Sequence, residues 1–224
     1  MKKITTLLIV ICISFITYAQ ENRGLDNRFY VRVGYAKPTG SCLGVDQFYV
    51  DVKRTGGMFE LGSIFMINNL DLGDGLRLGI NVDYVEFAYL HFSWEDFMYG
   101  EYFFHTGLLS TKVGPSISYN PVSKLVIDAF IKAKISWVGG GFLNAPDDPE
   151  EDESSYIGYM GFGFSTGLNI RYGALIVGFD FNSSNIKLED RDWPDEYLGN
   201  GFDFSDTGDK SKMSYFTISL GVNF

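Results

Sequence analysis

The stretch Met213–Phe224, M-S-Y-F-T-I-S-L-G-V-N-F, decides the fold. Its residues alternate between two faces with a period of two, which predicts a β-strand rather than a helix. One face carries Ser214, Phe216, Ile218, Leu220, Val222 and Phe224, and the other carries Met213, Tyr215, Thr217, Ser219, Gly221 and Asn223. An apolar face opposite a small or polar one, ending on an aromatic residue, is typical of a transmembrane β-strand between lipid and a polar lumen.

The amino terminus has the pattern of a secretory signal peptide. Lys2 and Lys3 precede the apolar run Leu7–Ile16, and Thr17-Tyr18-Ala19 offers small residues for cleavage after Ala19. The run is too short to span a membrane as a helix. We therefore predict a signal peptide over 1–19, a periplasmic segment over 20–28 and a barrel over 29–224. Cys12 is lost with the leader, so the remaining Cys42 has no partner for an internal disulfide.

Composition and charge narrow the function classes. Loss of Lys2 and Lys3 lowers the basic count from 18 to 16 against 28 acidic residues, a net charge of −12. An acidic exported chain argues against nucleic acid as a partner. Aromatic residues make up 17% of the sequence and glycines number 26, and barrel strands use both. No apolar run of 18 residues follows the leader, so no transmembrane helix is expected.

Seven further stretches alternate like the last one. They cover 29–37, 58–67, 76 to about 91, 102–119, 125–137, 156–171 and 174–182. Short turns near 68–75, 120–123 and 172–173 alternate with long connections, as in outer-membrane barrels with short periplasmic turns. Every lipid-exposed backbone group needs a partner, so the last strand must close on the first. We expect an all-β, antiparallel up-and-down barrel of eight strands, or ten if 48–53 pairs as a separate arm.

Two irregularities and several loops are also predicted. The alternation shifts after Val85, which fits a β-bulge or emergence from the bilayer. Pro115 removes a ladder donor from a strand that should be fully paired, so a bulge is expected there too. Loops are expected over 92–101, 139–155 and 183–211, and the second carries six acids between Asp147 and Glu153.

The charged residues of the strands share the face opposite the apolar one. They are Arg32, Glu60, Arg77, Asp83, Lys112, Asp128, Lys132, Lys134, Arg171 and Asp180. A soluble, lipocalin-like barrel would show the same alternation with the charges outward. The aromatic strand ends, at Tyr35, Tyr84, Tyr119, Trp137 and Tyr156, favour the membrane barrel, with the charges in the lumen.

The whole mature chain resembles the outer-membrane β-barrel domain proteins common in Bacteroidota. The resemblance rests on the Lys-Lys signal ending in Ala-Gln, the eight alternating segments and the terminal Gly221-Val222-Asn223-Phe224. It implies an outer-membrane location in a Gram-negative bacterium rather than a particular activity. It also implies that the barrel-assembly machinery reads the closing strand, with Tyr215, Phe216, Ile218, Leu220, Val222 and Phe224.

An eight-stranded barrel leaves room inside only for side chains, so the inward charges should pair and pack as a plug. This predicts a non-enzymatic barrel with a structural or surface-interaction role. The loops 139–155 and 183–211 are the candidate contacts for an extracellular partner. The alternative is a narrow pore or a carrier of small hydrophobic molecules. No cofactor and no metal site is expected.

A third hypothesis is a lipid A-modifying hydrolase. His91 and Ser93, with Glu95 or Glu101 nearby, are reminiscent of outer-membrane lipid A deacylases, because a histidine beside a serine can activate it as a nucleophile. The pattern is short and falls in an expected loop, so no catalytic residue is assigned. The acidic run 146–153 lacks the spacing and the glycine of a calcium loop. His105 is expected at the membrane interface.

Overall fold

A computed structural model describes residues 25–39, 52–73, 75–96, 100–143, 154–157, 160–187 and 210–224. Several expectations lie outside these residues. They concern the signal peptide 1–19, Cys42, the segment 48–51, the acidic run 146–153 and the part of the last long loop between 188 and 209. No helix in the described ranges is both long and apolar enough to cross a membrane.

The described chain forms nine β-strands in one antiparallel sheet. Their bounds are β1 Arg28–Pro38, β2 Lys53–Asp71, β3 Leu76–Asp96, β4 Gly100–Val122, β5 Leu125–Leu143, β6 Ser154–Ile157, β7 Gly161–Tyr172, β8 Leu175–Lys187 and β9 Lys210–Asn223.

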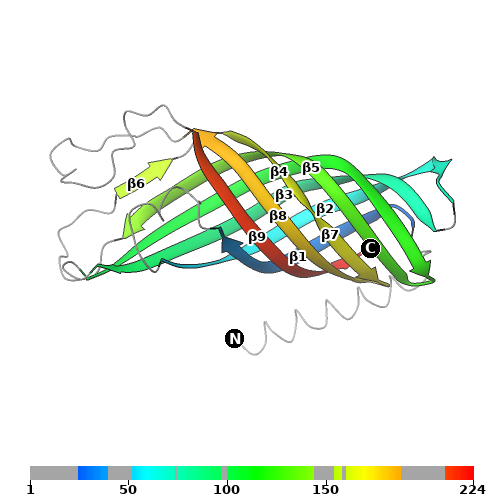
Figure 1. Cartoon of the computed structure of the whole chain (residues 1–224), viewed down its shortest axis with the longest axis horizontal. Helices are drawn as coiled ribbons and strands as arrows, with labels where there is room; N and C mark the ends of the chain where they lie inside the picture. Colours follow the sequence, from blue (N-terminus) through cyan, green and yellow to red (C-terminus); the bar gives the residue numbers. More distant parts are fainter. Residues whose placement is uncertain are drawn as a thin grey trace.

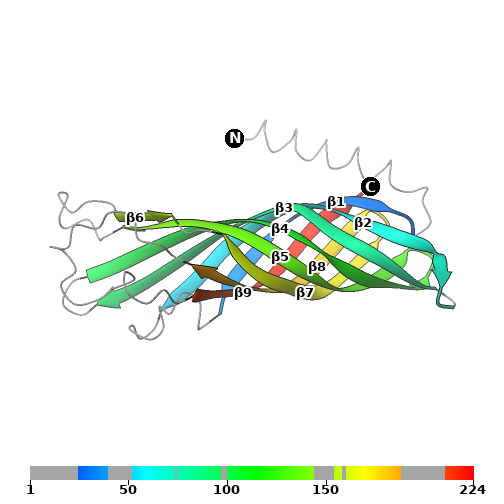
Figure 2. The ribbon, with the colours of Figure 1, turned by 90° about the horizontal axis from the view of Figure 1, so that it is seen from above.

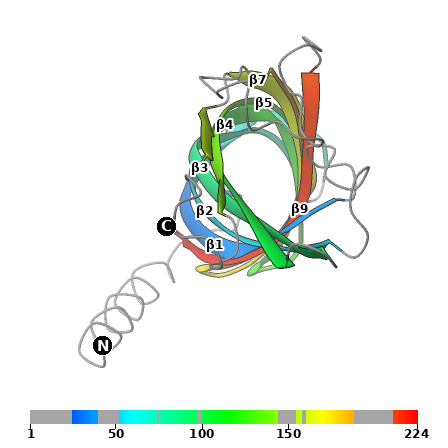
Figure 3. The same ribbon diagram turned by 90° about the vertical axis from the view of Figure 1, so that its left-hand side faces the viewer.

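Eight of these strands close into a ring. Each strand pairs with the next around the circle β1-β2-β3-β4-β5-β7-β8-β9, and β9 pairs with β1 over Tyr30–Pro38 (Figures 1 and 3). The short β6 pairs only with β5, over Gly139–Phe142. It lies on the same edge of β5 that pairs with β7 over Leu125–Ser136. It therefore continues the line of β7, and the two correspond to the single predicted strand over 156–171. The eight-stranded up-and-down barrel is confirmed, and the closed ring leaves no place for a ten-stranded one among the described residues.

The strands differ in length in a way the sequence did not predict. β2, β3, β4 and β5 span 19 to 23 residues, whereas β1, β7, β8 and β9 span 11 to 14. The long strands therefore run on beyond one end of the ring, opposite the short turns (Figures 1 and 2). The expected loop over 92–101 is wrong, because β3 runs to Asp96 and β4 begins at Gly100. The loops expected over 139–155 and 183–211 likewise contain the ends of β5, β6, β8 and β9.

The apolar side chains face outward and the charged ones inward. Ile131 and Ile218 are 56% and 57% exposed, whereas Lys132 is fully buried in the ring. Outward aromatic rings lie near the short turns, at Phe29, Tyr119 and Tyr172, and higher on the wall, at Tyr35 and Tyr84. A lipocalin-like barrel would show the opposite arrangement, so that alternative is wrong.

One of the two expected irregularities is present. The registers of β3 with β2 and β4 shift between Asp83 and Glu86, and Tyr84 and Val85 both face outward there. This bulge reverses the faces of all later β3 residues, as the change in alternation predicted. The bulge expected at Pro115 is wrong, because the β4–β5 register is the same on both sides of it. Proline here removes a hydrogen bond without adding a residue to the strand.

Candidate functional site

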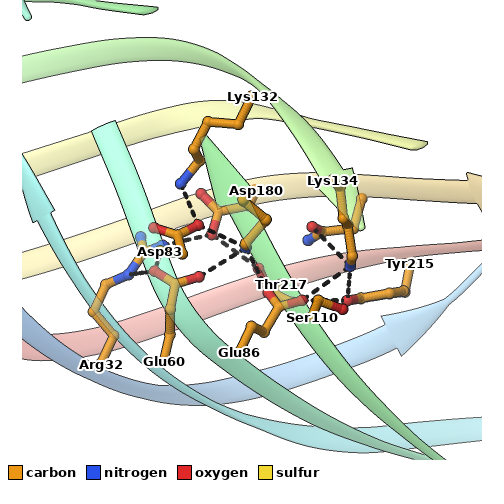
Figure 4. Close-up of polar contacts among 12 residues, drawn as sticks. Arg32, Glu60, Asp83, Glu86, Ser110, Lys132, Lys134, Asp180, Tyr215 and Thr217 are labelled. Carbon is orange, nitrogen blue, oxygen red and sulfur yellow. Dashed lines mark hydrogen bonds and ion pairs between the residues drawn. The ribbon is translucent and has the colours of Figure 1, made fainter. Parts of the chain in front are cut away.

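The centre of the barrel holds a network of buried ion pairs contributed by most of the strands (Figure 4). Arg32 of β1 has three partners there. Its Nε donates to Glu60 Oε1 at 2.9 Å, and Nη2 contacts both Glu60 and Asp180, the latter at 3.0 Å. Nη1 donates to Asn169 Oδ1 at 2.6 Å. The planar guanidinium thus connects β1 to β2, β7 and β8 across the lumen.

Lys112 of β4 also has three partners. Its Nζ lies 2.8 Å from Glu60 Oε2, 3.1 Å from Asp83 Oδ2 and 2.6 Å from Glu86 Oε2. Three carboxylates therefore converge on one ammonium group, which has three protons to donate. All four side chains are fully buried.

Two lysines of β5 complete the network from the opposite wall. Lys132 Nζ lies 2.6 Å from Asp83 Oδ2, and Lys134 Nζ lies 2.9 Å from Glu86 Oε1. Lys134 also contacts the hydroxyl of Tyr215, which donates to Glu86 Oε1 at 2.6 Å. The closing strand β9 is thereby tied to β3 and β5 through the lumen.

The network is electrically balanced. Its four cations are Arg32, Lys112, Lys132 and Lys134, and its four anions are Glu60, Asp83, Glu86 and Asp180. Each charge has at least one partner of opposite sign within 3.1 Å. An isolated charge at such a site would be very costly, so the arrangement is tolerated only as a complete set.

The remaining predicted charges lie nearer the short turns. Arg171 Nε lies 2.7 Å from Asp128 Oδ2, and Ser118 donates to Asp128 Oδ1 at 2.5 Å. Asp128 and Arg171 are both buried and form a second, smaller cluster. Arg77 is half-buried on the same face of β3, opposite Asp71 of β2. The structure thus brings eight of the ten predicted charges into buried ion pairs with one another, and Lys134 pairs with Glu86, which was not predicted.

Lys134 pairs with a carboxylate that sequence reasoning missed. Glu86 follows the bulge at Tyr84 and Val85, and it lies on the inward face only because the bulge reverses the alternation. The signal was present, since the change of pattern after Val85 placed Phe87 outward and so Glu86 inward. Tyr30 was also missed as a member of the lumen. Its hydroxyl contacts Asp83 and donates to Asn81 Oδ1 at 2.9 Å.

Buried apolar side chains lie in the lumen on both sides of the network. Toward the long-strand end lies a buried cluster of Ala36, Met58, Ala88, Leu90, Phe92, Phe104, Leu108, Val138, Ile186, Met213 and Tyr215. Toward the short turns lies a second cluster of Tyr30, Ile64, Met66 and Ile176. The charged layer therefore lies between two apolar clusters, and in such low-dielectric surroundings its ion pairs are stronger than they would be in water.

Gly178 leaves the space that the Arg32 guanidinium occupies. A Cβ atom built on Gly178 of β8 would lie 1.9 Å from Nη1 of Arg32, so a larger residue would displace the guanidinium. Glycine inside a strand often marks such a site of close approach.

The closing strand β9 contributes to both faces of the wall. Tyr215 points inward to Glu86, whereas Phe216, Ile218 and Leu220 are more than half exposed on the outside. Val222 pairs with Val31 and Leu175, and Phe224 exchanges backbone hydrogen bonds with Phe29 at 2.8 and 3.3 Å. The last residues of the chain thus stabilise the pairing of β9 with β1.

The serine–histidine pair of the hydrolase hypothesis lies on β3, not in a loop. Ser93 is buried, and the Nδ1 atom of His91 lies 3.2 Å from His105 Nδ1 on β4. The side chains of Glu95 and Glu101 lie outside the described part of the molecule.

Comparison with known proteins finds similarity in solved structures only. No family model and no curated protein matches the chain. Ail of Yersinia pestis, solved with the heparin analogue sucrose octasulfate, is 14% identical with a TM-score of 0.46, covering 89% of this chain and 99% of Ail. Neisserial surface protein A is 14% identical with a TM-score of 0.41, covering 88% and 95%. The outer membrane protein OprG of Pseudomonas aeruginosa is 13% identical with a TM-score of 0.38, covering 89% and 96%.

Proposed function

We propose that this chain is a non-enzymatic outer-membrane β-barrel of a Gram-negative bacterium, with a structural or surface-interaction role. One observation carries the proposal: an outward apolar face surrounds a central network of charges that is buried from solvent. A soluble protein would not expose Val33, Ile131 and Leu220 by more than half around a buried salt-bridge network. Acyl chains are the surroundings in which this distribution is stable.

The long-strand end is the proposed surface region. A tilted strand of about 9–11 residues crosses a bilayer, so β2 to β5 have roughly ten residues to spare. At about 3.3 Å per residue, these extensions would form a wall that rises roughly 20 Å above the lipid. The connections within 139–155 and 183–211 leave from this end, so they are the proposed contacts for an extracellular partner.

Surface labelling of single cysteines tests location and orientation. In a Cys42→Ser background, Lys53→Cys marks the long-strand end and Lys124→Cys marks a short turn, and both lysines are exposed. We expect a membrane-impermeant maleimide to label Lys53→Cys on intact cells and Lys124→Cys only after the outer membrane is permeabilised. Labelling in the opposite order, or recovery of both variants in the soluble fraction, would overturn the proposal.

Planar-bilayer recording tests the pore alternative. Because the charged layer is neutral and lies between two buried apolar clusters, we expect purified full-length protein to give no unitary conductance steps. A general porin in the same bilayers serves as the positive control. Reproducible steps from this protein, absent from mock preparations, would favour a pore over a packed scaffold.

A further inference from the structure

The only two histidines of the sequence face each other across neighbouring strands. His91 of β3 and His105 of β4 occupy directly opposite positions in the ladder, on the outward face beyond the bulge. Both side chains are half-buried. Phe103 stacks on His91 with ring centroids 5.8 Å apart, and Tyr89 stacks on His105 with centroids 5.6 Å apart. The aromatic rings hold both imidazoles in place.

The ring nitrogens converge on a common point. The two Nδ1 atoms lie 3.2 Å apart, closer than the ring centroids at 4.6 Å, so the Nδ1 edges face each other. The hydroxyl of Tyr89 contacts the same Nδ1 atom of His105. Two nitrogen atoms and one oxygen atom of the kinds that coordinate metal ions therefore lie together on one part of the outer wall.

Hydrogen bonds alone cannot satisfy both contacts of His105 Nδ1 at once. In a neutral imidazole Nδ1 is either a donor or an acceptor, so His105 Nδ1 makes one good hydrogen bond, to either His91 or Tyr89. If both rings were protonated, two cations would lie side by side. A metal ion is different, because it accepts lone pairs from both nitrogens at once.

The spacing also agrees with metal coordination. Zinc binds histidine nitrogen at about 2.0–2.1 Å in tetrahedral geometry, which places two ligating nitrogens about 3.4 Å apart. The observed separation of 3.2 Å needs only a small side-chain adjustment. Imidazole ligands select zinc, copper and nickel over the hard ions calcium and magnesium.

We propose that His91 and His105, with the Tyr89 hydroxyl beside them, bind a divalent transition-metal ion such as Zn²⁺ on the outer wall of the β3–β4 hairpin. The ion would be held by the two Nδ1 atoms, with water or an external ligand completing its coordination. The site would link the two strands at a place where they run beyond the other half of the barrel.

Calorimetric titration of ZnCl₂ into full-length, tag-free protein in detergent micelles tests this proposal. We expect one equivalent to bind with micromolar affinity and to shift the imidazole NMR signals of both histidines. His91→Gln and His105→Gln should each weaken binding by about tenfold or more, and Tyr89→Phe should weaken it less. CaCl₂ should cause no shift of the imidazole signals.

Thr55→Ala is the matched control, because Thr55 is the β2 residue opposite His91 and is exposed on the same face. It should bind zinc like the wild type. Zinc binding that survives in the double variant His91→Gln/His105→Gln would assign the ion to acidic residues elsewhere and overturn the proposal. So would absence of binding by wild-type protein that shows the heat-sensitive gel mobility of a folded barrel.

Discussion

Replacing Lys112 with methionine is expected to lower the free energy of unfolding by about 3–5 kcal/mol, as breaking a buried ion pair from one side does. The substitution keeps a long, flexible side chain but removes the ammonium group from among Glu60, Asp83 and Glu86. The network would then hold one more anion than cations, with three carboxylates around an uncharged methyl group. Urea unfolding in lipid vesicles, followed by tryptophan fluorescence, measures the change.

Two further variants separate charge from packing. Lys124→Met removes an exposed turn lysine and should change stability by less than about 0.5 kcal/mol. Lys112→Met/Glu86→Gln restores charge balance, so it should be more stable than the sum of the two single changes implies. If Lys112→Met is as stable as Lys124→Met, the buried ion pairs do not hold the interior together as the structure indicates.

The architecture was predictable because alternation is a direct consequence of a two-sided wall. In β1, for example, Val33 and Tyr35 had to face one way and Arg32 the other, and the structure places them so. Strand ends were less predictable. Near its carboxyl end β3 no longer alternates between an apolar outward face and a polar inward face, because Phe92 is inward and apolar there. With that contrast lost, the stretch 92–101 resembled a loop.

The site was predictable as a set of inward charges but not as a set of contacts. Which carboxylate meets Lys112 depends on the stagger between strands, and the single extra residue at the bulge decides that Glu86 does. The histidine pair has the same origin. His91 meets His105 because the β3–β4 hairpin is symmetric about the connection between Asp96 and Gly100, which no local pattern reveals.

Replacing Ile218 with arginine is the corresponding change on the outer face. Ile218 lies in the middle of β9, between Tyr35 of β1 and Phe179 of β8, and is 57% exposed. A cation on the lipid-facing side near the midplane of a barrel costs about 2–4 kcal/mol. We therefore expect Ile218→Arg to lose that much stability in vesicles and to insert more slowly. The same urea titration, with the heat-sensitive gel mobility of the folded barrel, measures both effects.

Depth, rather than the arginine itself, should set the size of this effect. Asn185→Arg places the same side chain on the exposed outward face of β8, ten residues beyond Leu175 and near the far edge of the apolar belt. There the cost should fall to about 0–1 kcal/mol, because the guanidinium reaches water or headgroups. Equal costs at the two positions would mean that no hydrocarbon layer surrounds Ile218. In that case the exposed apolar face would need a protein partner to cover it, and the proposal of a membrane-spanning barrel would be wrong.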